Sequence, residues 1–286
     1  MINFSQNPEA FKLWIYTWFG LNLNCPTTPS SDDKLSGWRK LPWRETNDIY
    51  AIVISEFMLQ QTQVMRVREY YPRWIMQFPD WAALASASRA EVLCAWQGLG
   101  YNRRALRLQD CARILIETYQ GKVPQDYDTL CALPGIGPAT AAAIQIFGFN
   151  KPSLYIETNV RAVYLHHFFP NAISRIDDKK IIPFIEATQD TKHPRLWNWL
   201  ILDYGAWIKK HFPNPTRTST QYRRQSSFKN SRRYYRGQIL KRVLQTPLSI
   251  QSIVDIFPEI NINEVIRDLQ KEGFILVKGT TIYPSK

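Results

Sequence analysis

The sequence predicts an all-helical protein with a small mixed module near its C-terminal end, and two observations support this. From Ile49 to about Lys210 apolar residues recur at spacings of three and four, and no alternating strand pattern interrupts them. Beyond residue 230, three shorter helical patterns precede two β-rich runs. The 286 residues, 45% of them hydrophobic, suffice for two domains and exclude a disordered chain.

The helices are bounded by recognisable start and stop signals. Residues 1–19 form an amphipathic pattern, and the polar turn formers at 22–37 predict a surface loop. Ser88 is predicted to cap a short helix, and the amphipathic helix after it closes on Gly121. Two further helices are predicted on either side of a break at Pro134–Gly137.

The charge of the chain indicates its class of partner. A net charge of +12 and a pI of about 9.6 suggest a polyanionic partner, nucleic acid first and an anionic membrane second. A solvated basic surface without such a partner is an equal alternative on charge alone. No segment reaches the roughly 20 apolar residues of a membrane span, and the N-terminus does not resemble a signal peptide. Cys94, Cys111 and Cys131 lie among apolar neighbours, which predicts reduced core thiols. We expect a cytoplasmic protein, nucleoid-associated if bacterial, without membrane contact.

Residues 204–254 contain no acidic residue, and their polar part at 213–229 predicts a basic arm. Beyond it come a helix over 232–245, a second helix capped by Ser249, a third stopped at Gly273, and a terminal hairpin. This order resembles the winged helix-turn-helix module, in which the third helix enters the major groove of DNA. A small dimerisation or packing module is the alternative. The basic side chains assigned to the arm and its continuation are Arg217, Arg223, Arg224, Arg232, Arg233 and Arg236.

The segment LPGIGPATAAAI, residues 133–144, is the sharpest local motif. Pro134 favours a tight turn, while Gly135 and Gly137 permit positive φ and leave backbone N–H groups uncovered. A helix starts directly afterwards, so its N-terminal dipole points at the same place. The motif therefore predicts a helix-hairpin-helix that grips a phosphate without a basic side chain; a structural corner between helices is the alternative. The residues assigned to DNA contact here are Gly135, Ile136, Gly137, Ala139 and Thr140.

Three segments then carry a family resemblance: LPWRETNDIYAIVISEFMLQQTQV at 41–64, WQGLGYNRRA at 96–105 and YIETNVRAV at 155–163. Together with the hairpin they resemble the MutY-type adenine DNA glycosylases of the helix-hairpin-helix base-excision superfamily, relatives of endonuclease III. The resemblance covers roughly residues 10–210 and implies a two-lobed glycosylase fold. Its expected divisions are one lobe from 1–45 and 153–212, a six-helix-type lobe with the hairpin at 46–152, the basic arm at 213–229 and the winged-helix-like domain at 230–286.

Two carboxylates are the expected catalytic residues. Glu56 lies in the apolar run IVISEFML, where an acid must face a cleft or accept costly burial, an environment that suits a proton donor. In the family the matching Glu protonates the purine. Glu157 stands where the family usually has Asp, which stabilises the oxocarbenium ion at the sugar; the Glu side chain is one methylene longer. One acid and one anionic stabiliser follow the logic of glycoside hydrolysis.

Ala139 aligns with the position where endonuclease III-type enzymes carry a strand-cutting lysine. Without an amine no Schiff base forms there, which predicts a monofunctional glycosylase with water as nucleophile. The target base must leave the helix before reaction. By resemblance, Gln61 fills the gap in the stack and Tyr101 wedges into the opposite strand. The other side chains assigned to DNA are Gln60, Gln63, Arg103, Arg104 and Asn159.

Two departures from the family are informative. The family's iron–sulfur loop, C-x6-C-x2-C-x5-C, would place its cysteines at Lys209, Thr216, Ser219 and Gln225, so we expect no cluster and no other cofactor or metal. The basic arm is a candidate replacement for that loop as a DNA clamp. MutY proteins also usually end in a larger nudix-like domain that reads 8-oxoguanine, and here only the segment 230–286 remains.

The sequence therefore predicts a monomeric, monofunctional DNA glycosylase of base excision repair, acting on double-stranded DNA. The expected target is a mispaired adenine opposite guanine or 8-oxoguanine. A second hypothesis is removal of thymine from G·T or of a deaminated base such as hypoxanthine. A third, of another class, is a non-catalytic DNA-binding protein that reuses the scaffold; Glu56 inside an intact QQTQV motif opposes it.

Overall fold

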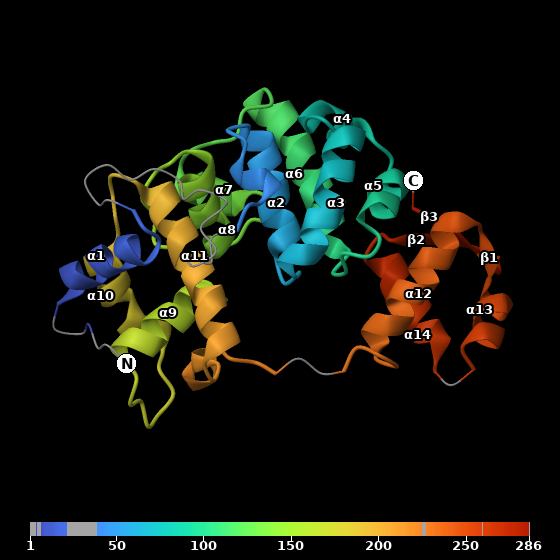
Figure 1. Cartoon of the computed structure of the whole chain (residues 1–286). Helices are drawn as coiled ribbons and strands as arrows, with labels where there is room; N and C mark the ends of the chain where they lie inside the picture. Colours follow the sequence, from blue (N-terminus) through green and yellow to red (C-terminus); the bar gives the residue numbers. More distant parts are fainter. Residues whose placement is uncertain (1–3, 5–6, 22–38, 225–226, 259, 286) are drawn as a thin grey trace. The chain divides into compact units, whose positions relative to one another are not determined.

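A computed structural model describes residues 4, 7–21, 39–224, 227–258 and 260–285 (Figure 1). The predicted loop at 22–37 and Gln225 lie outside the described residues. The contacts divide the chain into two compact units. The first comprises 1–53, 125–132 and 136–224, and the second comprises 54–124, 133–135 and 225–286.

The first unit is built around two packed helices, α9 (Thr158–Phe168) and α11 (Pro194–His211). α9 is buried on nearly all sides, because eight of its residues from Val160 to Phe168 are inaccessible to solvent. The other elements of the unit are α1 (Pro8–Trp18), η1 (Pro42–Arg44), α7 (Tyr127–Ala132), α8 (Pro138–Ala143), η2 (Ile144–Gly148), α10 (Asp178–Thr188) and η3 (Pro215–Thr218).

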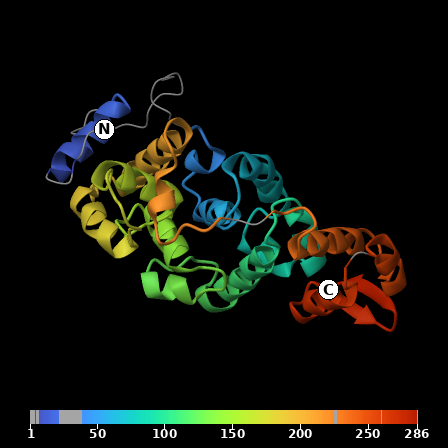
Figure 2. The same ribbon diagram turned by 90° about the horizontal axis from the view of Figure 1, so that it is seen from below.

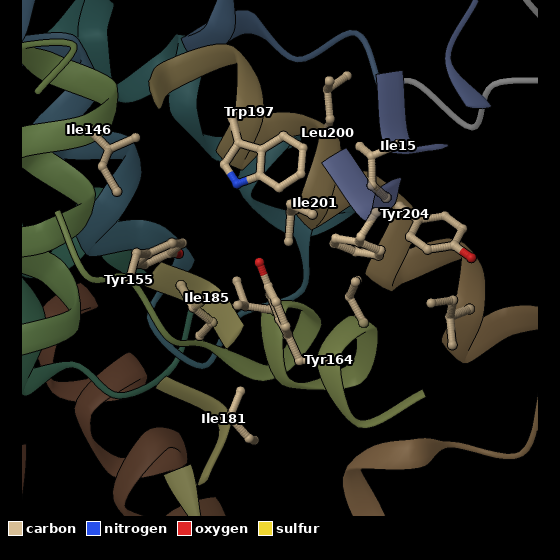
Figure 3. Close-up of a cluster of buried hydrophobic side chains, with 14 of the residues drawn as sticks. Ile15, Ile146, Tyr155, Tyr164, Ile181, Ile185, Trp197, Leu200, Ile201 and Tyr204 are labelled. Atoms are coloured by element: carbon tan, nitrogen blue, oxygen red, sulfur yellow. The ribbon is translucent and has the colours of Figure 1, made fainter. Parts of the chain in front are cut away.

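The core of the first unit is strongly aromatic (Figure 3). Trp197 of α11 is 2% exposed and stacks against Tyr16 of α1. Tyr164 of α9 lies beside Ile185 and Ile181 of α10. Large rings bury 150–250 Å² each, so these contacts account for much of the apolar area that holds the helices together.

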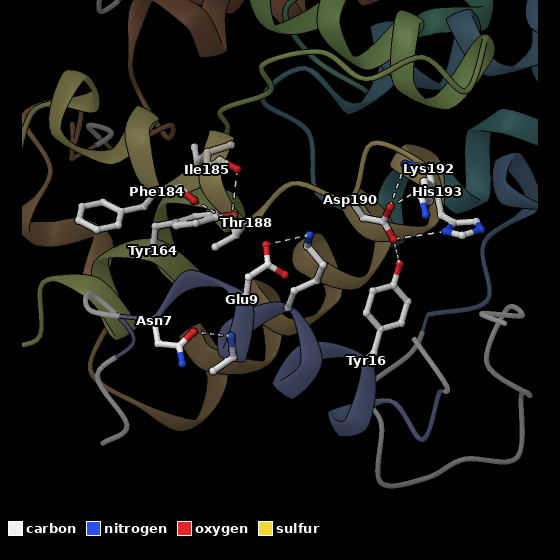
Figure 4. A network of polar contacts seen from close by, with 12 residues as sticks. Asn7, Glu9, Tyr16, Tyr164, Phe184, Ile185, Thr188, Asp190, Lys192 and His193 are labelled. Carbon is white, nitrogen blue, oxygen red and sulfur yellow. Dashed lines mark hydrogen bonds and ion pairs between the residues drawn. The ribbon is translucent and has the colours of Figure 1, made fainter. Parts of the chain in front are cut away.

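Hydrogen bonds join several polar groups in and around this core (Figure 4). The Tyr16 hydroxyl donates to Asp190 Oδ2 at 2.6 Å, and Asp190 Oδ1 accepts the backbone N–H groups of Lys192 and His193. Burial, followed by the hydrogen bond to Asp190, raises the pKa of Tyr16 above its ordinary value. These bonds tie α1 to the turn that precedes α11.

The second unit begins within α2 (Ile49–Leu59), whose first half belongs to the first unit. Capping signals set the helix boundaries as predicted. Ser88 forms a capping box with Glu91 at the start of α5, and Gln120 and Gly121 adopt left-handed conformations after α6. The further helices of this part are α3 (Val64–Gln77), α4 (Trp81–Ser86), α5 (Arg89–Trp96) and α6 (Arg103–Tyr119).

The chain ends in a small module of three helices and three strands, which we call the terminal module (red in Figures 1 and 2). Ser249 caps its second helix, and the strands pair antiparallel in the order β1-β3-β2, with Val277 opposite Ile282. The helices are α12 (Arg232–Gln245), α13 (Ile250–Ile256) and α14 (Ile262–Lys271), and the strands are β1 (Leu248–Ser249), β2 (Ile275–Lys278) and β3 (Thr281–Pro284).

The predicted all-helical body, the break at 133–137 and the winged-helix-like order of the terminal module are confirmed. Of the three thiols expected in the core, Cys111 is buried and Cys131 is only partly buried, while the assignment of Cys94 is wrong, because this residue is exposed. The sequence also did not reveal the π-helical turn η2 or the short strand β1. Among the residues that the structure describes, no helix has both the length and the apolar character needed to cross a bilayer.

Candidate active site

Glu56 lies in the last third of α2, a helix whose other residues are almost all buried. The helix begins where Asp48 Oδ1 accepts the backbone N–H of Tyr50 at 3.0 Å. Glu56 itself is only partly buried, whereas the neighbouring Ser55 and Phe57 are fully inaccessible. Glu56 is therefore an acid on an otherwise apolar helix and keeps partial access to solvent, and its role as a proton donor stays a prediction.

The C-terminal end of α2 is held by the guanidinium of Arg104. Its Nη1 donates to the carbonyl oxygens of Phe57 at 2.8 Å and Met58 at 2.9 Å, and also to that of Gln60. Phe57 and Met58 belong to the last turn of α2, whose carbonyls have no partner within the helix, and Gln60 follows the helix end. A cation there also interacts favourably with the helix dipole. Arg104 therefore fixes the end of the helix that carries Glu56.

The same guanidinium joins this helix end to the loop before α6. Nη2 donates to the Thr62 hydroxyl at 2.9 Å and to the Gly100 carbonyl at 2.9 Å, and the group lies 5.1 Å from the Trp96 ring centroid. Burial lowers the pKa of Arg104 to about 10, so it stays charged at neutral pH. Arg104 is among the side chains expected to contact DNA, but its guanidinium instead donates to carbonyl oxygens within the protein.

Gln61 and Tyr101, which we call the wedge pair, lie in the two segments that Arg104 joins: the turn after α2 and the loop before α6. Both have left-handed backbones, with φ of 54° and 48°, and both are exposed, Tyr101 by 39%. Such conformations cost non-glycine residues about 1–3 kcal/mol each and cluster at functional sites. Both residues expected to enter the DNA stack are thus exposed and held in strained backbone conformations, a property that they share with Gln120, Asn150 and Asn230.

The neighbouring predicted DNA residues differ in what they contact. Gln60 Nε2 donates to the Gly135 carbonyl at 3.1 Å, which links the end of α2 to the hairpin turn. Gln63 is exposed at the start of α3. Arg103 is exposed and forms an ion pair with Glu272 of the terminal module, with a distance of 2.8 Å between Nη2 and Oε2.

The hairpin has the predicted break, with one correction. Gly135 has φ of +81°, and a Cβ there would lie 2.6 Å from the Phe57 ring, so only glycine fits. Gly137, by contrast, is extended with φ of −100°, because it serves as the N-cap of α8. Ile136 is buried, while Ala139 is exposed in the first turn of α8, before the first intrahelical bond at Ala141. A helix start is a general site for anions.

Glu157 is the N-cap of α9 in the first unit. Its Oε1 accepts the backbone N–H groups of Asn159 and of Val160, the latter at 3.1 Å. Asn159, assigned to DNA contact, thus uses its backbone to hold Glu157. Burial raises the pKa of Glu157, while the positive charge of Lys209, the two N–H groups and Arg39 oppose that rise.

Lys209 and Arg39 form the charged surroundings of Glu157. Arg39 is itself held by Asp203, which accepts its Nε at 2.6 Å and its backbone N–H at 2.7 Å. The pKa of Lys209 is lowered, because burial outweighs the attraction of Glu157. Sequence reasoning did not foresee this cationic environment, since Arg39 and Lys209 are distant from Glu157 along the chain.

Three of the four positions where the family's cluster ligands would fall are described. Lys209 lies beside Glu157, and Thr216 and Ser219 are buried in hydrogen-bonded turns. Ile176 N–H donates to the Thr218 carbonyl at 2.7 Å, which fastens this turn to the segment before α10. Within the described part of the chain, no three His, Cys, Asp or Glu side chains gather in a way that could hold a metal ion.

The basic residues assigned to the arm fall into two groups. Arg217, Arg223 and Arg224 are exposed. Arg232 and Arg236 belong to α12 and pair with acids of the terminal module, Arg232 with Asp268 at 2.6 Å and Arg236 with Glu272 at 2.8 Å. Arg233 is partly buried on the same helix. Part of the basic segment is therefore neutralised within the protein.

Part of the chain matches a known protein family and several curated proteins. Residues 54–183 match the family described as HhH-GPD superfamily base excision DNA repair protein. The chain is 48% identical over 126 residues to an adenine DNA glycosylase of Mycolicibacterium smegmatis, covering 44% of this chain and 43% of that protein. It is 36% identical over 172 residues to an adenine DNA glycosylase of Buchnera aphidicola, covering 60% and 49%.

Among solved structures, the chain is similar to a thermostable thymine-DNA glycosylase, with a TM-score of 0.58 at 22% identity over 74% of this chain and 92% of that one. An endonuclease III in a non-covalent DNA complex gives a TM-score of 0.54 at 17% identity, over 74% and 91%. These likenesses show the fold alone. The chain spans about half the length of the curated relatives it matches. Over residues 54–183 the chain is similar to the HhH-GPD superfamily of base excision DNA repair proteins, and the curated relatives that it resembles are adenine DNA glycosylases.

Proposed function

We propose that this protein is a DNA N-glycosylase of base excision repair that removes adenine mispaired with guanine or 8-oxoguanine, acting as a monomer on double-stranded DNA. One observation carries the proposal. Arg104 joins the end of the helix that bears Glu56 to the loops that hold the strained, exposed wedge pair. An acid on a helix whose end is joined by one guanidinium to two loops with exposed side chains suits an enzyme that extrudes a base before acting on it.

The proposed chemistry uses the two carboxylates in different states. Glu56 protonates the departing adenine and so makes it a better leaving group. Glu157 remains ionised and stabilises the positive charge that develops on the sugar, while water completes the hydrolysis. Lys209, Arg39 and two backbone N–H groups support this role, because each lowers the pKa of Glu157 against the effect of burial.

The absence of an amine at Ala139 supports hydrolysis without strand cleavage. This residue is exposed at the start of α8, where the hairpin would approach DNA, and its methyl group offers no nucleophile. We further propose that the turn around Thr216 and Ser219 is stabilised by hydrogen bonds and packing where relatives use an iron–sulfur cluster.

A panel of duplexes tests the proposal. Each duplex carries one labelled mispair: A·G, A·8-oxoguanine, T·G or hypoxanthine·T. After incubation, hot alkali converts abasic sites to strand breaks. We expect cleavage of the adenine strand in the first two duplexes. Cleavage confined to T·G or hypoxanthine·T would replace adenine with the second target class. Tight binding without abasic sites in any duplex would favour the non-catalytic hypothesis.

A further inference from the structure

A large groove in the second unit lies against the wedge pair. Its volume is about 1010 Å³, at the upper limit of the roughly 300–1,000 Å³ typical of small-molecule sites. One side is formed by Gln60–Gln63 and Gln97–Arg104, and the other by the terminal module, chiefly α12. The groove thus lies between the loops that carry the wedge pair and the terminal module, a module to which the family resemblance assigns no function.

The charge of the groove suits a polyanion. Its lining includes six basic side chains and one acid, Glu272. Glu272 Oε2 already lies 2.8 Å from both Arg103 Nη2 and Arg236 Nη2, so the acid is engaged by two of the cations. Aromatic surface is present as well, since Tyr101 is 39% exposed and Phe228 60% exposed. Basic side chains interleaved with exposed rings are the usual surface for a single nucleic-acid strand.

One face of α12 has the arrangement that a strand would need. Arg233, Gly237 and Lys241 stand four residues apart, so they form a single stripe, and all three line the groove. Glycine is unfavourable inside a helix, and a Cβ built on Gly237 would meet nothing within 4 Å, so packing does not require it. Because Gly237 has no side chain, a ligand can approach the helix backbone closely between Arg233 and Lys241.

The third helix of the module, α14, is less suited to this role. Its apolar side chains are buried, and its acids Asp268 and Glu264 pair with Arg232. Its exposed cations, Arg267 and Lys271, do not line the groove.

We propose that the terminal module binds DNA through the α12 stripe, and that the groove holds the strand that keeps its base when the mispaired base is extruded. The inference rests on the proposed function, because extrusion leaves one unpaired base beside the wedge pair. Phosphates of that strand lie at Arg233 and Lys241, and its unpaired base lies toward Tyr101 and Phe228. The module would then select the partner base, the task for which relatives use a different domain.

Two variants of the full chain test the stripe, with binding measured on a duplex that carries a tetrahydrofuran abasic analogue opposite guanine. Gly237→Leu fills the groove; the protein should melt no lower than wild type, because Leu favours a helix and open space surrounds the site. We expect its Kd to rise more than about tenfold. Lys241→Glu should lower the salt dependence of log K by about one unit. The matched controls on α14, Arg267→Glu and Lys271→Glu, should bind nearly as wild type.

A second comparison identifies the strand. Uncharged methylphosphonates are placed near the abasic analogue, in one strand at a time. Methylphosphonates in the strand without the lesion should reduce the difference in affinity between the wild type and Lys241→Glu. The same reduction found only with methylphosphonates in the lesion strand would overturn the assignment. Wild-type affinity in both α12 variants with loss in the α14 controls would overturn the inference and leave the glycosylase intact. A wild-type protein that neither binds these duplexes nor releases a base would overturn both proposals.

Discussion

Replacement of Arg104 by Met should loosen the end of α2 and both wedge loops together. Met retains most of the apolar length of the side chain and removes every donor. In the wild type the guanidinium donates hydrogen bonds to the carbonyl oxygens of Phe57 and Met58 in the last turn of α2. It also donates to the Gly100 carbonyl in the loop before α6. These acceptors would lose their partner in the variant.

The size of the effect follows from these contacts. A hydrogen bond to a charged donor contributes about 1.5–3 kcal/mol net, and a cation at a helix C-terminus about 0.3–1 kcal/mol. The bonds share one guanidinium and do not add fully. We expect the free energy of unfolding to fall by about 3–5 kcal/mol, the range for breaking a buried polar network. The neighbouring Arg103→Met is a matched control; its side chain is 63% exposed in a single ion pair, so the loss should stay below about 1 kcal/mol.

Urea unfolding followed by tryptophan fluorescence gives the stability difference, and hydrogen exchange by mass spectrometry locates it. Peptides covering 57–64 and 97–104 should exchange faster in Arg104→Met, while α9 remains protected. Base release should slow more than DNA binding weakens, because the wedge pair and Glu56 lose their common support. Equal stability and equal exchange in the Arg104 and Arg103 variants would refute this role for Arg104.

Three further predictions concern the protonation of Glu157, the lack of an amine at Ala139 and the expected lack of an iron–sulfur cluster. Excision should fall as pH is lowered through the raised pKa of Glu157, above the ordinary value of 4.5, because only the ionised form stabilises the cation. Lys209→Met should move this fall in the excision rate to higher pH, and Lys209→Arg should not. An unchanged pH–rate profile in Lys209→Met would disprove the electrostatic link between Lys209 and Glu157. Borohydride should trap no covalent protein–DNA adduct, and gel electrophoresis that reveals one would identify another amine, with Lys209 the first to test. Elemental analysis of the purified protein should find no stoichiometric iron; one cluster per chain would show that the alignment at Lys209, Thr216 and Ser219 is wrong.

Local signals allowed the sequence to predict much of the fold. Caps such as Ser88 and Ser249, and left-handed stops such as Gly121 and Gly273, depend on residues close together in the chain, and the structure shows them where the pattern indicates. Gly137 shows the limit of such reasoning. Glycine permits several backbone conformations, and only the start of α8 decides that this one is extended.

The sequence motifs indicate the candidate site residues, but they do not indicate the contacts that hold those residues in place. Glu56, Gln61 and Tyr101 carry a recognisable motif. The role of Arg104 was not visible, because its acceptors are backbone carbonyls, which have no sequence signature. The same holds for Lys209, whose effect on Glu157 arises from packing between distant segments. Cys94 was misassigned for a related reason: a short helix with weak amphipathic character does not reveal which face is covered.

Single-turnover base release by the wild type and by Glu56→Gln shows directly whether Glu56 is the proton donor. The substrate is a duplex with adenine opposite 8-oxoguanine, and abasic sites are counted after hot alkali. Loss of the proton donor should slow release by about 10²- to 10⁴-fold, with affinity for the duplex unchanged within a few-fold because the hairpin and the wedge pair remain. A Glu56→Gln variant that releases adenine at the wild-type rate would show that Glu56 is not the proton donor.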